Sequence, residues 1–122
     1  MIGYVTLGTN DLKRAASFYD PLLAELGAKR FMETPRSISW TAGPQGGLGV
    51  CLPFDGKPAS VGNGVMVALA VESRAKVDAI YGKAMELGGT DEGPPGPRGN
   101  SGYYGAYFRD LDGNKLNAFF VG

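Results

Sequence analysis

The sequence predicts an α+β fold built from two copies of one module, each a strand, a helix and three further strands. Sliding the chain by 62 residues aligns Tyr4 with Met66 and Phe18-Tyr19 with Ile80-Tyr81. After one gap, the Glu-Leu-Gly that ends the first helical pattern falls on the one that ends the second. The offset is about half of the 122 residues and recurs in strand, helix and helix stop. Such a repeat indicates a duplicated module.

The first module is expected at about residues 1–53. Residues 2–8 alternate between apolar and polar side chains, as in a strand. A helix should follow with Thr9 or Asn10 as its cap, and Pro21 should break or restart it before Gly27 ends it. Three strands are then expected, at residues 28–33, 36–42 and 48–52.

The second module is expected at about residues 65–122, after a linker at about 54–64. Its strand, at residues 65–71, leads into a helix at 73–87 that Glu72-Ser73 would cap. Residues 90–102 are rich in Gly and Pro, so we expect an irregular segment with at most a short edge strand at 90–92.

The chain should end in a tight hairpin around Asp110-Leu-Asp-Gly-Asn114, where Gly113 supplies a positive φ angle. In the second arm, apolar Leu116, Ala118 and Phe120 alternate with a mixed set, Lys115, Asn117 and Phe119. One sheet face therefore packs a core, and Asn117 points away from it.

Composition excludes several classes of protein. Twelve basic and twelve acidic residues give no net charge, so neither a nucleic acid nor a membrane surface is an expected partner. The N-terminus lacks the pattern of a signal peptide, and no apolar run is long enough to span a bilayer. One cysteine excludes an internal disulfide. We therefore expect a soluble cytoplasmic protein.

The aromatic strand, the motif Arg109-Asp-x-Asp-Gly-Asn114 and the closing strand resemble the C-terminal end of the vicinal oxygen chelate superfamily. This superfamily includes glyoxalase I, bleomycin-resistance proteins and extradiol dioxygenases. The repeat extends the resemblance over essentially the whole chain. It implies paired βαβββ modules that form a curved eight-stranded sheet cleft, with helices on the outer faces and usually a second copy completing a homodimer.

Metal-dependent members of that superfamily hold a divalent ion with His and Glu ligands on the first and last strands of each module. By the resemblance, these positions fall on Tyr4, Met66 and Asn117, and near Cys51 in the first module. None of the four is a carboxylate or an imidazole, and the chain has no histidine. We therefore expect no metal and no other cofactor.

Other side chains could bind a small molecule. Tyr4, Trp40, Tyr103 and Tyr107 could form an aromatic wall, although packing in the core or in a dimer interface is an equal alternative. Arg98 could hold a carboxylate or phosphate, or lie in solvent. Cys51 lacks a base that would activate it. The candidate ligand-binding cleft comprises Tyr4, Trp40, Cys51, Met66, Arg98, Tyr103, Tyr107, Lys115 and Asn117.

The aspartates near these residues have simpler interpretations. Asp11, Asp110 and Asp112 are expected as cap and turn residues, and Arg109 should brace the hairpin by pairing with the last two.

Three functions remain open. The first is a binding protein of the bleomycin-resistance type, with a dimeric cleft that holds a small organic molecule without the usual metal. The alternative is a metal-dependent glyoxalase-like lyase, isomerase or dioxygenase. A third, an enzyme that needs no metal and uses Tyr4, Cys51 or Lys115, has no recognisable catalytic constellation behind it. Fold alone does not decide among them, so catalysis is left undecided.

Overall fold

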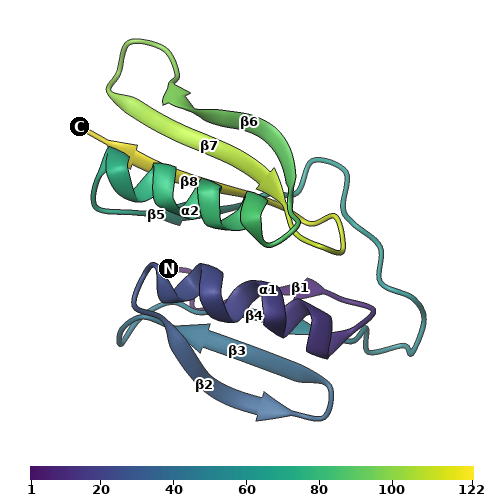
Figure 1. The fold of residues 1–122 in the computed structure, drawn as a ribbon. Coiled ribbons are helices and arrows are strands. Elements are labelled where there is room, and N and C mark those ends of the chain that lie inside the picture. The colour runs from purple at the N-terminus through teal and green to yellow at the C-terminus, as the bar shows by residue number, and fades with distance from the viewer.

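The computed structural model describes residues 1–122 as two modules that lie one above the other (Figure 1). In each, a single helix lies against a four-stranded sheet. The elements are β1 (Val5–Gly8), α1 (Leu12–Ala24), β2 (Lys29–Thr34), β3 (Ser37–Thr41), β4 (Leu48–Cys51), β5 (Val67–Ala70), α2 (Arg74–Glu86), β6 (Thr90–Pro97), β7 (Tyr103–Arg109) and β8 (Lys115–Val121).

The predicted repeat is confirmed, and the first strand and the helix of the two modules match residue for residue. Shifting β1 by 62 positions gives the bounds of β5, and the same shift takes the 13 residues of α1 onto those of α2. The strand orders also correspond, as β1-β4-β3-β2 in the first sheet and β5-β8-β7-β6 in the second. In each sheet the first and last strands of the module are parallel neighbours. The eight strands form two separate sheets within one chain.

Strand parity separates the two faces of each sheet. Leu48 and Val50 of β4, like Leu116 and Ala118 of β8, are buried in the core that α1 and α2 cover. Successive strand residues point to opposite faces, so their neighbours point away from the helices. We call this second side of each sheet, opposite its helix, the open face.

Two details of α1 refine the prediction. Asp11, which was expected as a cap or turn residue, caps the helix in place of Thr9 or Asn10, because its side chain accepts a hydrogen bond from the main-chain N of Arg14. The helix also runs through Pro21 without a break. An internal proline costs about 3 kcal/mol. Leu22 and Leu23, next in the chain, are 0% and 2% exposed. Burying one leucine contributes about 1.5–3 kcal/mol, so continuing the helix is favourable.

The Gly/Pro-rich segment after α2 is more regular than predicted. Strand β6 spans eight residues instead of the short piece expected at 90–92. It is an edge strand, so its prolines need no hydrogen-bonding partner on the outer side. Register shifts between Asp91 and Gly93, and between Gly93 and Gly96, absorb the irregular residues as bulges.

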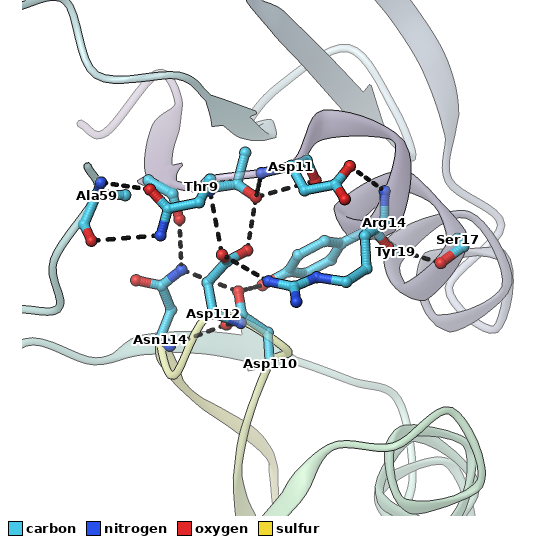
Figure 2. Close-up of polar contacts among 11 residues, drawn as sticks. Thr9, Asp11, Arg14, Ser17, Tyr19, Ala59, Asp110, Asp112 and Asn114 are labelled. Atoms are coloured by element: carbon cyan, nitrogen blue, oxygen red, sulfur yellow. Dashed lines mark hydrogen bonds and ion pairs between the residues drawn. The ribbon is translucent and has the colours of Figure 1, made fainter. Parts of the chain in front are cut away.

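The modules contact each other through α1 and α2 and through the turn between β7 and β8. Asp112 in this turn accepts hydrogen bonds from the Thr9 hydroxyl at 2.6 Å and the Asn10 main chain at 3.1 Å. It also pairs with Arg14 at 3.1 Å. Figure 2 shows the side chains of the turn meeting the start of α1. Asp112 therefore lies in the turn as predicted, and it also links the two modules.

Asp110 is the buried centre of this network. Its carboxylate is bonded by the phenol of Tyr19 at 2.6 Å, by the side chain of Asn114 at 2.9 Å, and by the main-chain N–H groups of Asp112 and Asn114. Burial first, and the charge of Asp110 second, raise the pKa of Tyr19 above its ordinary value. The phenol therefore keeps its proton and donates a hydrogen bond to Asp110.

Neither helix is long and apolar enough to cross a membrane.

Tyr19→Phe should lower the free energy of unfolding by about 1.5–3 kcal/mol at neutral pH, because a buried carboxylate loses a donor. The folded protein holds the Tyr19 proton more tightly than the unfolded chain does. The wild-type advantage is therefore complete below about pH 10, the ordinary tyrosine pKa, and shrinks as the pH rises further. Urea unfolding of both proteins from pH 7 to pH 11 measures this.

Tyr81→Phe is the matched control, since Tyr81 occupies the equivalent position of α2 and donates to the exposed Asp91. We expect it to cost less than about 1 kcal/mol. This account would be contradicted if both variants lost the same free energy of unfolding at neutral pH. It would also be contradicted if the difference in free energy of unfolding between wild type and Tyr19→Phe stayed constant above pH 10.

Candidate functional site

The open face of the second sheet gathers most of the predicted site residues. Strand β8 contributes Lys115, Asn117 and Phe119, which alternate with the core residues Leu116 and Ala118. The hairpin register places Tyr107 opposite Asn117 on this face. It thereby confirms the predicted parity of β8.

Tyr103 lies flat on this face. Its ring stacks on that of Phe119, with centroids 5.5 Å apart and an angle of 5° between the planes. Gly105 makes room for it, because a Cβ atom there would lie 2.7 Å from Cε1 of Tyr103. Burial first, and Tyr107 second, raise the pKa of Tyr103. Tyr103 is therefore a neutral phenol held in one orientation.

Asn117 supports Tyr103 from below. Its Oδ1 accepts a hydrogen bond from the Tyr103 hydroxyl at 2.9 Å. Its Nδ2 donates to the carbonyls of Ala106 at 2.9 Å and Ala118 at 3.2 Å. The residue is 1% exposed although it lies on the open face. Its amide therefore positions the phenol, and a ligand would meet the rings above it.

Two cations surround the ring of Tyr107. The guanidinium carbon of Arg98 lies 5.5 Å from the ring centroid, and Nζ of Lys115 lies 5.7 Å from it. At these distances a cation is attracted to the face of an aromatic ring. Three predicted site residues, from β7, β8 and the loop after β6, therefore converge.

Arg109 differs from its predicted role. It pairs with Glu92 of β6 instead of Asp110 or Asp112, and its Nη1 donates to the Gly113 carbonyl at 2.9 Å. Asp112 is occupied by α1 and the loop before it, and Asp110 by Tyr19 and by donors of the turn itself. The ion pair with Arg109, the first cause, lowers the pKa of Glu92.

A cavity of about 510 Å³ lies beside this cluster. Its walls are Arg109, Lys115, Met66 and residues 61–65 of the linker. Met66, which precedes β5, thus reaches the same cavity as Lys115 and Arg109. Ligand pockets commonly measure about 300–1,000 Å³, so the space suits a small molecule.

The first sheet holds the remaining candidates. Tyr4, just before β1, is 72% exposed on the open face, and Cys51 at the end of β4 is partly buried. Trp40 is different, because it is 2% exposed and its Nε1 donates to Asp20 at 2.8 Å. Trp40 therefore belongs to the core beneath α1, the alternative that the sequence left open.

A second cavity, of about 400 Å³, lies between the modules. Residues of β1 and β4 line one side of it and Val67–Ala70 line the other. Its polar side chains are Thr41 and Gln45, and the Thr41 hydroxyl already bonds the carbonyls of Gly43 and Gly46. This cavity offers apolar contact but little that would orient a ligand.

The register specifies the position of the expected metal site that the resemblance placed near Cys51. Thr6 pairs with Gly49 in the first sheet, and its equivalent Ala68 pairs with Asn117 in the second. Gly49, two residues before Cys51, is therefore the counterpart of Asn117.

The residues at the four positions that correspond to metal ligands do not suit a divalent ion. Tyr4, Gly49, Met66 and Asn117 offer no carboxylate and no imidazole, the donors that Zn²⁺ and hard divalent ions prefer. The structure also brings no three His, Cys, Asp or Glu side chains together in a metal-binding group.

The chain belongs to the Glyoxalase/Bleomycin resistance protein/Dioxygenase superfamily, which residues 1–118 match. A glyoxalase/bleomycin resistance protein from Albidiferax ferrireducens T118 is 36% identical, with a TM-score of 0.92 over 100% of this chain and 99% of that one. This confirms the predicted α+β fold of paired βαβββ modules. No curated protein matches the sequence.

More distant structures share the fold alone. A glyoxalase/bleomycin resistance protein/dioxygenase family enzyme from Burkholderia phytofirmans PsJN is 18% identical, with a TM-score of 0.77 over 98% of each chain. Lactoylglutathione lyase from Agrobacterium tumefaciens is 22% identical, with a TM-score of 0.72 over 98% of this chain and 92% of that one.

The candidate cleft omitted three residues that shape the site. Phe119 shares the parity of Asn117, which was a usable signal. Gly105 and Glu92 carried none, because their roles depend on which residues the folded strands place opposite them.

Proposed function

We propose that this protein binds a small organic molecule on the open face of the second sheet, without the catalytic metal usual in its superfamily. The observation that carries the proposal is the convergence of three aromatic rings and two cations on one face beside a cavity. Aromatic surface with a few oriented polar groups is the usual composition of a small-molecule site.

The donor set favours binding over metal-dependent catalysis. At the position of the last-strand ligand stands Asn117, whose amide is engaged by Tyr103 and two main-chain carbonyls. A metal-dependent lyase, isomerase or dioxygenase relies on an ion that polarises a substrate oxygen. The groups here fit that role poorly, so this function is the alternative.

We propose that a second copy of the chain covers the open faces. The first sheet leaves Tyr4, Phe31 and Met32 more than half exposed, at 72%, 55% and 53%. Strands β1 and β5 are unpaired at one edge of each sheet. Exposed apolar surface and open strand edges are features that oligomers cover. A homodimer would place the first sheet of one copy against the second sheet of its partner.

Binding can be tested with the neutral aromatic probe 2-naphthamide. We expect saturable changes in the NMR signals of Tyr103, Tyr107 and Phe119. Tyr107→Ala should weaken the affinity for the probe several-fold, because that ring supplies much of the contact. Tyr81→Ala is the control, because it deletes a tyrosine of α2, the helix that covers the opposite face of the sheet. It should leave the affinity unchanged. Changes confined to the cavity between the modules, or none at all, would refute the site.

The dimer can be tested by sedimentation at micromolar concentration. We expect twice the 12.8 kDa chain mass for the wild type. Phe31→Glu should give a monomer, because it places a charge in the buried interface. Ala79→Glu makes the same change in charge at an exposed position of α2 and should remain dimeric. A monomeric wild type would refute the second copy.

Divalent ions should not stabilise the protein. A specific ligand at a hundredfold excess over its Kd adds about 2.7 kcal/mol, enough to raise the melting temperature by several degrees. We expect no such shift with Zn²⁺, Ni²⁺, Mn²⁺ or Fe²⁺. A reproducible stabilisation that Asn117→Ala abolishes would overturn the metal-free proposal and favour the alternative function.

A further inference from the structure

We propose, on the basis of the function proposed above, that the ligand is an anion: an aromatic or apolar body that carries a carboxylate or phosphate. Arg98 and Lys115 would hold the anionic group beside Tyr107, and the body would extend over the rings or into the adjoining cavity. The inference depends on the hydrogen-bonding groups that these two cations leave unused.

Arg98 is held in place with donors to spare. Its Nη2 donates to the Pro94 carbonyl at 2.7 Å and its Nη1 to the Pro97 carbonyl at 3.4 Å. The guanidinium fits closely, because a Cβ atom at Gly96 would lie 3.1 Å from Nη1. A guanidinium has five N–H groups, and no carboxylate pairs with this one. The Gly/Pro-rich segment thus positions a cation whose remaining donors are free for a ligand.

Lys115 makes no hydrogen bond and no ion pair in the protein, and its one polar contact is with the ring of Tyr107. The ion pairs of the chain use other cations, namely Arg14, Arg30, Lys76, Lys83 and Arg109. Register places Lys115 directly opposite Arg109. Like charges directly opposite in a sheet are destabilising, and Glu92, which Arg109 binds, is the one carboxylate of this face that compensates. An anionic ligand would relieve the excess positive charge.

The other sheet supplies no opposing charge. The open face of β1, β3 and β4 carries small uncharged residues: Thr6, Ser37, Ser39, Thr41, Gly49 and Cys51. On β2, Lys29 pairs with Thr41 and is the one charged residue on this side. If a second copy closes the cleft with its first sheet, as proposed, the site stays positive. Positive clefts with low-dielectric walls concentrate anions.

The test compares three probes of one shape by calorimetric titration: 2-naphthoate, 2-naphthyl phosphate and neutral 2-naphthamide. We expect at least one anion to bind about tenfold or more tightly than the amide, since charge-assisted hydrogen bonds are the stronger class. Raising the salt concentration should reduce this advantage.

Lys115→Gln removes a cation that has no hydrogen bond or ion pair in the protein and only the contact with the Tyr107 ring, so the fold should be unaffected and most of the advantage should vanish. Arg98→Gln should act in the same direction. Lys13→Gln, on the exposed side of α1, is the control for net charge and should keep the advantage. Equal affinity for all three probes would overturn the anion inference and leave the binding site standing. Binding of none would refute the proposed function itself.

Discussion

The buried carboxylate of Asp110 is the interaction on which the rest of the structure depends. A charge removed from water is tolerated only when hydrogen bonds replace its hydration. Four donors do so here: two main-chain N–H groups of the turn, the amide of Asn114 and the phenol of Tyr19. Three of them shape the turn between β7 and β8, and the fourth comes from the other module. One side chain therefore fixes both the hairpin and the orientation of α1 against it.

The candidate site follows from that hairpin. With the turn fixed, Tyr107 must stand opposite Asn117 and Gly105 opposite Phe119. A slip of one residue would carry Tyr103 and Lys115 to the helix-covered face and bring core residues out. Gly105 then determines how closely Tyr103 can lie on the strand. The arrangement of the candidate site residues therefore depends on the Asp110 network, which fixes the turn that joins their two strands.

Sequence reasoning succeeded where a pattern is local or repeated. The 62-residue offset predicted both helices and the strands that precede them, and the parity of β8 predicted which side Asn117 faces. It failed where tertiary packing outweighs local preference. Pro21 stays helical because Leu22 and Leu23 are buried, and β6 persists through its prolines because it is an edge strand. Arg109 pairs with Glu92 because the nearer aspartates are occupied. Trp40 was ambiguous because an aromatic residue suits a core and a cleft equally well.

The proposed site differs in the sign of its charge from the metal site that the resemblance implies. The resemblance implies a site where carboxylate and imidazole ligands attract a cation, which in turn polarises a substrate oxygen. Here an amide turned into the sheet replaces the last-strand carboxylate, and Arg98 and Lys115 lie beside the aromatic rings above it. Such a site would attract an anion directly, because fixed cationic side chains would take the place of a bound metal ion. The scaffold can accommodate this change because the βαβββ modules are held together by their helices and by the Asp110 turn, none of which needs a metal to fold.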